Sequence, residues 1–226
     1  MNFTPLSLRM LVLTDTHGGE QNLRAVVARE INSVDAVVFC GDAAPYFDPS
    51  NVSYLIGILD AIEKPVILVP GNMDDPKSYR DTDNIRVIHK GIALVNGYAF
   101  LGIGGSTPTP FGTVFELSEE EIERALSSLW MEAAKLGPVI LVSHAPPYDT
   151  ACDIASGGRH VGSRALRRFI ERYSPLLCLC GHIHESRAID RVDGTIVVNP
   201  GPLRDGFYAL VELRGFEVKR IELRRL

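Results

Sequence analysis

The chain has 226 residues, of which 46% are hydrophobic and 23% charged, and this length is enough for one well-filled globular core. Its formal net charge of −5 argues against a non-specific nucleic-acid binder, because such proteins usually carry a basic stripe. No apolar run reaches the roughly 18 to 20 residues of a membrane span, and the N-terminus lacks a secretion signal, so we expect a cytoplasmic protein without a membrane partner.

Six short apolar runs are predicted to be buried strands, because continuous apolar runs are typical of strands covered on both faces. They comprise residues 10–14, 36–40, 66–70, 139–143, 176–180 and 196–198. The motifs that follow them are Asp15-x-His17, Gly41-Asp42, Gly71-Asn72, His144, Gly181-His182-Ile183-His184 and Asn199-Pro200-Gly201. In open α/β sheets, sites lie beyond the carboxyl ends of strands, so these side chains are expected to form one metal site.

Helical segments are predicted between these runs. The clearest begins with a capping box at Ser118 and Glu121 and ends before Gly137. Apolar residues at helical spacing predict three more helices, over residues 23–31, 55–62 and 163–173. We interpret all four apolar stripes as core faces rather than cofactor sites.

Two later segments alternate like strands joined by tight turns. They are residues 91–102, with a turn at Asn96-Gly97, and residues 188–223, with turns at Asp193-Gly194 and Arg214-Gly215. Since crossover helices pack on outer faces, we expect an α/β fold with two facing mixed β-sheets flanked by helices, a four-layer α/β/β/α sandwich. No linker interrupts this order, so residues 1–226 are expected to form a single domain.

The four cysteines are too few for a disulfide scaffold in a chain of this length. The Cys178-x-Cys180 spacing invites a metal or redox interpretation, but alternate positions on a strand place both thiols on one face of a sheet. We interpret these cysteines as small core residues.

The chemistry of the predicted site favours two metal ions. Its carboxylates, imidazoles and single amide suit divalent ions such as Mn, Fe, Co, Ni, Zn or Mg, and one ion would be over-liganded by the whole set. Two ions about 3.5 to 4 Å apart can clamp the attacking and leaving oxygens of phosphoryl transfer. Taken singly, Asp15, Asp42 and Asn72 could be cap or turn residues, and a lone histidine is usually structural. Their joint occurrence at strand ends favours ligation.

The ordered motifs resemble those of the calcineurin-like metallophosphoesterase superfamily from Asp15 to Gly201. The resemblance implies the same α/β/β/α sandwich and a dinuclear centre, for which manganese is the expected metal. It implies two ligand sets that share a bridging Asp42: Asp15, His17, Asp42 and His184 for the first ion, and Asp42, Asn72, His144 and His182 for the second.

The sequence departs from the superfamily pattern at Met73, where many members have a histidine. That histidine is credited with stabilising the transition state or protonating the leaving oxygen, and a thioether cannot donate a proton. Either another group replaces it, or the enzyme favours esters whose leaving group departs unaided. In addition, no acid or amide follows Asp42 within residues 43–45, and Ser143 precedes His144 where glycine is commoner.

Residues 157–163 are predicted to bind substrate, because they end at a helix start, where backbone N–H groups favour an anion. Arg159 could bind a phosphate oxygen, and His160 could supply the proton that Met73 cannot; a plain loop histidine is the alternative. His160-Val-Gly-Ser163, with the later Gly-His-Ile-His-Glu, resembles the branch that includes nucleotide-binding metallophosphoesterase-domain proteins. Residues 104–111 are expected to form a loop near the site, either mobile or held rigid by prolines, and His89 is expected at the surface.

The sequence therefore predicts a dinuclear metal-dependent phosphoesterase that hydrolyses small phosphodiesters or nucleotide-type phosphate esters by attack of a metal-bridging hydroxide. Asp42, Asn72 and His160 are the predicted catalytic residues, and Arg159, His160 and Asn72 the predicted substrate-binding residues. The alternative is a non-catalytic metal-binding scaffold of the same fold that serves protein interaction, which the complete ligand set disfavours. A protein phosphatase is less favoured because no peptide-binding extension is visible. The sequence is compatible with a homo-oligomer.

Overall fold

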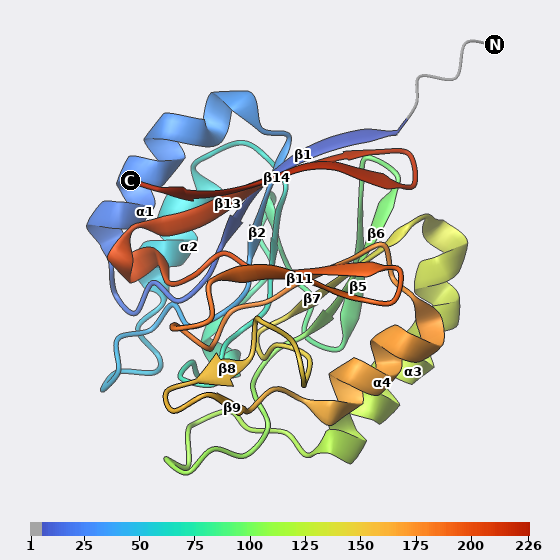
Figure 1. The fold of residues 1–226 in the computed structure, drawn as a ribbon. Helices are drawn as coiled ribbons and strands as arrows, with labels where there is room; N and C mark the ends of the chain where they lie inside the picture. The colour runs from blue at the N-terminus through green and yellow to red at the C-terminus, as the bar shows by residue number, and fades with distance from the viewer. Residues whose placement is uncertain (1–5) are drawn as a thin grey trace, which may run out of the picture.

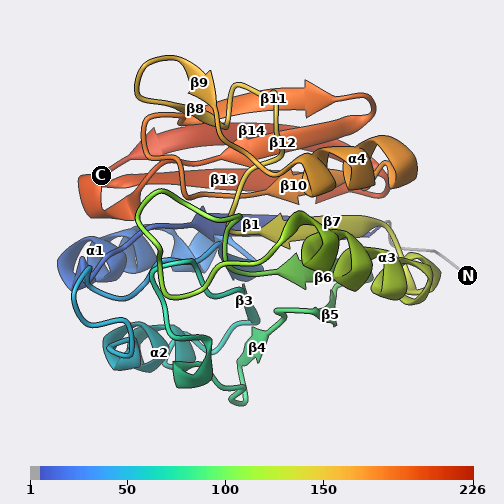
Figure 2. The ribbon, with the colours of Figure 1, turned by 90° about the horizontal axis from the view of Figure 1, so that it is seen from below.

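The computed structural model describes residues 6–226 and shows two six-stranded β-sheets that face each other, with helices on their outer sides (Figures 1 and 2). In the first sheet the order is β14-β13-β1-β2-β3-β4, with β1 (Ser7–Leu13), β2 (Ala36–Phe39), β3 (Val66–Leu68), β4 (Ile85–Val87), β13 (Phe207–Arg214) and β14 (Glu217–Arg225). In the second the order is β11-β12-β10-β7-β6-β5, with β5 (Gly91–Val95), β6 (Tyr98–Ile103), β7 (Val139–Ser143), β10 (Leu177–Leu179), β11 (Ala188–Val192) and β12 (Thr195–Asn199). This arrangement confirms the predicted pair of mixed sheets flanked by helices.

Parallel strands form the centre of each sheet. Strands β1 to β4 are parallel, while β13 and β14 add antiparallel strands at one edge. Strands β6, β7, β10 and β12 are likewise parallel, between antiparallel edge strands β5 and β11. The carboxyl ends of β1, β2 and β3 therefore meet at one edge of their sheet, and those of β7 and β10 at one edge of the other.

The α-helices in the described residues occur where apolar spacing predicts them: α1 (Glu20–Glu30), α2 (Ser53–Asp60), α3 (Glu119–Leu136) and α4 (Arg164–Tyr173). Helices α1 and α2 pack on the first sheet, and α3 and α4 on the second (Figure 2). The capping box of α3 is confirmed, because Ser118 Oγ accepts the Glu121 N–H at 3.2 Å and Glu121 Oε2 accepts the Ser118 N–H at 2.8 Å. These bonds satisfy two backbone donors at the start of the helix.

Three apolar clusters separate the four layers. Neighbouring residues of one strand enter different clusters: Val37 packs toward α1 and α2, whereas Val38 lies between the sheets with Phe100. This follows from the alternation of side chains along a strand. Cys178 and Cys180 are fully buried in the cluster beneath α3 and α4, which confirms that they are core residues.

Short elements escape prediction from the sequence. Strand β4 has three residues, and the hairpin strands β8 (Ile154–Ala155) and β9 (Arg159–His160) have two each. None of these three strands lies in a continuous apolar run of at least about four residues, unlike the three-residue strands β3 and β10. His160, which the sequence alone places in a loop, therefore lies on a strand of the β8–β9 hairpin.

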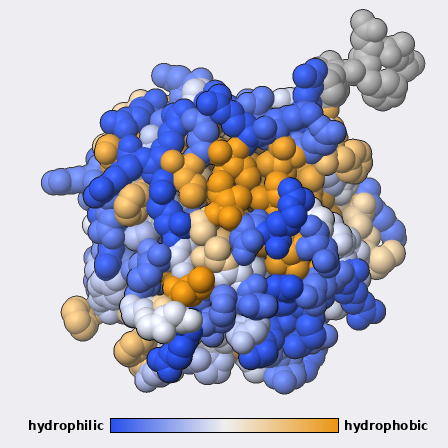
Figure 3. All heavy atoms as spheres, in the orientation of Figure 1, coloured by the Kyte–Doolittle hydropathy of each residue, from blue (hydrophilic) through white to orange (hydrophobic). Residues whose placement is uncertain are grey.

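Apolar side chains gather on the face between edge strands β14 and β11 (Figure 3). There β14 contributes Val218, Ile221 and Leu223, which are half-buried and pack on the cluster between the sheets. No helix in residues 6–226 is long and apolar enough to cross a membrane. The homo-oligomer stays a prediction.

Candidate metal centre

The predicted ligands converge at the carboxyl ends of strands from both sheets. Asp15 and His17 follow β1, Asp42 follows β2, and Asn72 follows β3 in the first sheet, while His144 follows β7 and His182 and His184 follow β10 in the second. Hydrogen bonds join neighbouring turns within each sheet, from Asp15 N–H to Gly41 O at 2.9 Å and from Gly181 N–H to His144 O at 2.9 Å, and His182 N–H donates to Asp15 Oδ2 at 3.0 Å between the sheets. The strand-end argument therefore predicts correctly that these side chains lie close together.

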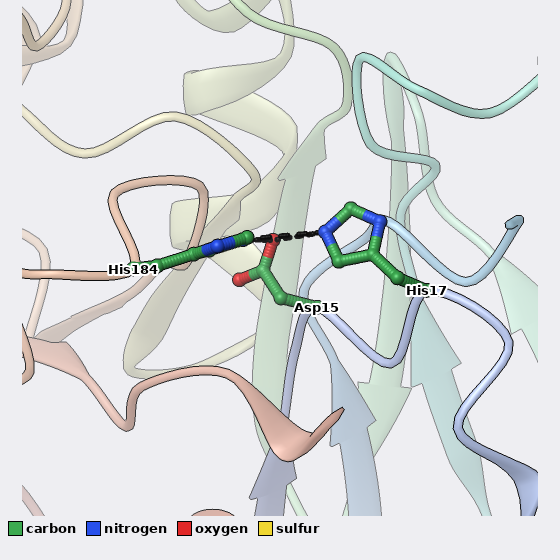
Figure 4. A group of neighbouring side chains, drawn as sticks. All are labelled: Asp15, His17 and His184. Carbon is green, nitrogen blue, oxygen red and sulfur yellow. Dashed lines mark hydrogen bonds and ion pairs between the residues drawn. The ribbon is translucent and has the colours of Figure 1, made fainter. Parts of the chain in front are cut away.

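One group of side chains comprises Asp15, His17 and His184, whose potential ligand atoms lie within 4.8 Å of one another (Figure 4). Asp15 Oδ1 lies 3.8 Å from His17 Nε2 and 3.3 Å from His184 Nε2, and the two Nε2 atoms are 3.2 Å apart. Asp15 Oδ1 is also buried without a hydrogen-bond partner among the described residues. Two imidazole nitrogens bound to one ion at about 2.1 Å would have a similar separation, so this group fits a metal ion.

The other group comprises Asp42, His144 and His182. His144 Nε2 lies 3.4 Å from Asp42 Oδ2 and 2.8 Å from Asn72 Oδ1, so the asparagine belongs to the same cluster. His144 Nδ1 is 2.7 Å from the carbonyl oxygen of Cys40. Because a carbonyl can only accept, Nδ1 carries a proton and directs Nε2 toward the cluster, an arrangement common for metal-binding histidines.

Asp42 connects the two groups. Its Oδ2 atom is 3.4 Å from His144 Nε2 in one group and 3.7 Å from His17 Nε2 in the other. Its Oδ1 accepts the backbone N–H of Met73 at 2.8 Å, which restrains the carboxylate from the opposite side. This position is the one expected of a carboxylate shared by two ions.

Charge is strongly coupled within the centre. Burial opposes ionisation of Asp15 and Asp42, but the neighbouring histidines outweigh it and lower the pKa of both carboxyls. Burial likewise opposes protonation of His144, yet Asp42 raises its pKa to about 9. Burial and the charge of His144 lower the pKa of His182 to about 4. The site thus combines ionised carboxylates with a histidine proton that a bound cation would replace.

Several residues of the centre adopt left-handed backbone conformations, which non-glycine residues usually avoid. The φ angles are 53° for Asp15, 43° for His17, 59° for Asp42 and 70° for His182. Each such residue costs about 1 to 3 kcal/mol and persists only where the surrounding structure enforces it. The packing around these turns therefore holds four of the predicted ligands in backbone conformations that they would not adopt unaided.

Glycines precede the ligands because the turns are packed against one another. A Cβ atom on Gly71 would lie 1.9 Å from Asp42 Oδ1, and one on Gly181 would lie 1.9 Å from Thr14 Oγ1 and 2.7 Å from Asp15 Oδ2. These distances are far below any contact between non-bonded atoms. The Gly-Asn and Gly-His pairs therefore reflect steric exclusion at the centre itself.

Asp74 holds the ligand turns together, a role that the sequence analysis missed. Its buried carboxylate accepts the N–H groups of Asp42 at 2.9 Å, Ala44 at 2.8 Å and Gly71 at 2.7 Å, and the hydroxyl of Tyr79 at 2.7 Å. Burial and the charge of Asp42 raise its pKa to about 6 despite these donors. The support expected from an acid directly after Gly41-Asp42 thus comes from the next strand. An acid three residues after a turn glycine was the available signal.

Replacing Asp74 with alanine is expected to lower the free energy of unfolding by about 3 kcal/mol, because several buried N–H groups would lose their acceptor. Urea denaturation of the metal-free protein measures this change. Asp75→Ala is the matched control, since Asp75 accepts only the N–H of Lys77 at 3.0 Å among the described residues and is expected to cost about 1 kcal/mol. Equal losses in the two variants would contradict the supporting role of Asp74.

Arg159 and His160 lie on β9 and are not part of either ligand group. His160 Nδ1 is 2.6 Å from Oδ1 of the buried Asp153, and this hydrogen bond raises the pKa of His160. The hairpin is tied to the turn that carries His184, because Ser156 Oγ donates to Glu185 Oε1 at 2.6 Å. A substrate or catalytic role for Arg159 and His160 therefore stays a prediction.

The loop after β6 lies beside the site, as expected. Asn72 Nδ2 donates to Thr113 Oγ1 at 3.0 Å, and Phe115 N–H donates to Asn72 O at 3.0 Å. Glu116 Oε1 accepts from the hydroxyls of Thr109 at 2.8 Å and Thr113 at 2.6 Å, which favours the rigid form of the loop.

The expectation that His89 is a surface residue was wrong. His89 is half-buried, its Nδ1 accepts the Gly104 N–H at 2.9 Å, and its ring meets that of Phe115 edge-on at 4.9 Å. Burial lowers its pKa to about 4, so the ring is neutral at pH 7 and supports the same loop. Isolated histidines give no sequence signal for such a packing role.

Comparison with known proteins agrees with the geometry. The family model described as calcineurin-like phosphoesterase matches residues 8–186. A protein of Methanocaldococcus jannaschii named Uncharacterized protein MJ1162 is 37% identical over 201 residues, which cover 86% of this chain and 88% of the relative.

Solved structures extend the likeness to the fold. The protein TT1561 of Thermus thermophilus is 20% identical with a TM-score of 0.74, over 96% of this chain and 98% of that one. Phosphopantetheinyl hydrolase from Mycobacterium tuberculosis is 16% identical with a TM-score of 0.57, over 88% of this chain and 91% of that one. Given the match of the family model to most of its length, the chain belongs to the calcineurin-like phosphoesterase family.

Proposed function

We propose that the protein is a phosphoesterase that uses two divalent metal ions to hydrolyse small phosphodiesters or nucleotide-type phosphate esters. The observation that carries the proposal is Asp42 Oδ2, which lies 3.7 Å from His17 Nε2 and 3.4 Å from His144 Nε2 and so can serve both ligand groups. Family membership supports phosphate ester hydrolysis, and one fold neighbour is named a phosphopantetheinyl hydrolase.

The residues present fit such ions. Asp15, His17 and His184 would hold one ion and Asn72, His144 and His182 the other, with Asp42 common to both. This set of carboxylates, imidazoles and an amide, without thiolates, suits Mn, Fe, Co, Ni, Zn or Mg, of which we propose manganese. When bound, the pair would supply a nucleophilic hydroxide and neutralise charge on the phosphoryl group. Because the ligands come from both sheets, residues 1–226 would act as one domain.

The chain's own groups would position the substrate and handle protons. Asn72 is fixed by His144 through Oδ1 and by Thr113 through Nδ2. His160 is held by Asp153, and this hydrogen bond raises the pKa of its ring, which favours the protonated form that a proton donor needs. Two alternatives follow from Met73: His160 would supply the missing proton if it reaches the leaving oxygen, and otherwise the enzyme would favour esters whose leaving group departs unaided.

Metal analysis and turnover together test the proposal. The purified protein is treated with a chelator, reloaded with Mn²⁺, Mg²⁺ or Zn²⁺, and assayed with bis(p-nitrophenyl) phosphate and with p-nitrophenyl phosphate. We expect two ions per chain and activity that disappears on chelation and returns with metal. Two bound ions without turnover of either ester would favour the alternative, a non-catalytic scaffold.

If His160 donates a proton, activity should depend on Asp153. Asp153→Asn removes the charged acceptor that raises the pKa of His160, so that pKa should fall and the alkaline limb of the kcat profile should move to lower pH. NMR titration of the His160 ring and a pH–rate profile measure the two shifts. A lower ring pKa with an unchanged alkaline limb, together with full activity in His160→Gln, would leave His160 without a catalytic role.

A further inference from the structure

A tyrosine and an arginine lie side by side at the rim of the first ligand group, although neither belongs to a recognised motif. The ring of Tyr46 stacks on that of His17, with centroids 4.3 Å apart and planes 10° from parallel. The tyrosine is still 43% exposed. A flat side chain that covers a candidate ligand yet remains open to solvent is well placed to meet a molecule approaching the centre.

Arg204 reaches the same rim from the other end of the chain. Its guanidinium donates to the Tyr46 hydroxyl, and its Cζ atom is 5.5 Å from the centroid of the Tyr46 ring. Because Tyr46 stacks on His17, this contact places the cation beside the first ligand group.

The backbone around Arg204 is firmly attached to the centre. The Arg204 N–H donates to Asp15 O at 3.2 Å, and the preceding Leu203 N–H donates to Thr14 O at 2.9 Å. Asn22 Nδ2 of α1 donates to the carbonyl oxygens of Leu203 at 3.0 Å and Arg204 at 2.9 Å. This attachment holds the arginine beside the first motif while its side chain remains partly free.

The charge of Arg204 has little compensation from the protein. Its Nε atom is 3.9 Å from Asp205 Oδ2, and the side chains are 37% and 50% exposed, so this ion pair contributes little. The Tyr46 hydroxyl is a neutral partner. A guanidinium with free donors favours the oxygens of a phosphate group, because its planar fork matches their spacing.

We propose that Arg204 and Tyr46 form the phosphate-binding rim of the centre, with the Arg204 guanidinium and the Tyr46 hydroxyl donating to phosphoryl oxygens of the ester. This inference rests on the proposed phosphoesterase function and deepens it by naming the groups that bind the anion. It adds Arg204 as a phosphate-binding candidate beside Arg159, which lies exposed on the β8–β9 hairpin.

The test compares Arg204→Ala, Arg204→Lys and Tyr46→Phe with the control Arg24→Ala, whose guanidinium pairs with Glu20 on the surface of α1. The measurements are KM and kcat for bis(p-nitrophenyl) phosphate, metal content, and calorimetric binding of inorganic phosphate to the Mn²⁺-loaded protein. Loss of hydrogen bonds to a charged group should raise KM and the phosphate Kd about ten- to hundredfold in Arg204→Ala. In Arg204→Lys both constants should rise less than in Arg204→Ala, and in Tyr46→Phe they should rise about three- to tenfold. In Arg24→Ala both should equal the wild-type values.

Two results would overturn the proposal. One is an unchanged KM and phosphate Kd in Arg204→Ala, and the other is a loss of bound metal in that variant, which would make Arg204 a support for the ligands. Phosphate binding is measured without turnover, so the experiment tests the phosphate-binding role of Arg204 and Tyr46 separately from the proposed hydrolysis. A wild-type protein that binds phosphate through Arg204 but hydrolyses no ester would refute the proposed function and support the rim.

Discussion

Replacing Asp42 with alanine is expected to remove both metal ions and to lower kcat/KM by at least about a thousandfold. Loss of a group that only orients a metal ligand typically lowers metal affinity or activity about ten- to hundredfold. Loss of a carboxylate shared by two ions should lower them more. The structural basis is the position of Asp42 Oδ2 between His17 and His144, at 3.7 Å and 3.4 Å from their Nε2 atoms. Metal content by mass spectrometry and activity on an aryl diester measure the effect.

Two comparisons make this result specific. Asn72→Ala should chiefly weaken the ion of the second group, because Asn72 Oδ1 contacts His144 at 2.8 Å and no residue of the first group among the described contacts. Asp83→Ala, at an exposed carboxylate, should retain both ions and full activity. Circular dichroism confirms that each variant is folded. Two ions per chain in folded Asp42→Ala would refute the shared ligand.

Met73 is expected to make hydrolysis depend steeply on the leaving group. Its N–H donates to Asp42 Oδ1 at 2.8 Å, so the residue lies beside the centre, yet its half-buried side chain has no proton to give. Because general acid catalysis typically contributes about 10² to 10⁴ in rate, aryl diesters should be cleaved about that much faster than alkyl diesters. Rates for diesters of graded leaving-group pKa measure this dependence.

Restoring an imidazole should reduce that dependence. Met73→His is expected to accelerate esters with poor leaving groups more than those with good ones, whereas Met73→Leu, which keeps an apolar side chain of similar size, should behave like the wild type. Metal content is measured in parallel, because a new histidine could bind an ion. An equally shallow slope in wild type and Met73→His would mean that another acid already fills the role, and a steeper slope in His160→Gln would identify it.

The sequence by itself determined the buried central strands, the α-helices and the order of the predicted metal-binding motifs. Continuous apolar runs, helical apolar spacing and the capping box at Ser118 are local signals, since they depend on neighbours within a few residues. The ligands could be located because parallel strands bring their carboxyl ends to one edge of a sheet. Asp15, Asp42 and His144 therefore meet as expected, although they are far apart in the chain.

The tertiary structure alone decided how that site is supported and surrounded. Asp74 accepts N–H groups from two different turns, His89 packs under the loop after β6, and Arg204 meets Tyr46 across 158 positions of sequence. His89, Arg204 and Tyr46 have no periodic or spaced pattern around them, and the only local signal for Asp74 is its place three residues after Gly71. Their partners are determined by how turns from separate strands pack, and such long-range contacts leave no local trace in the order of residues.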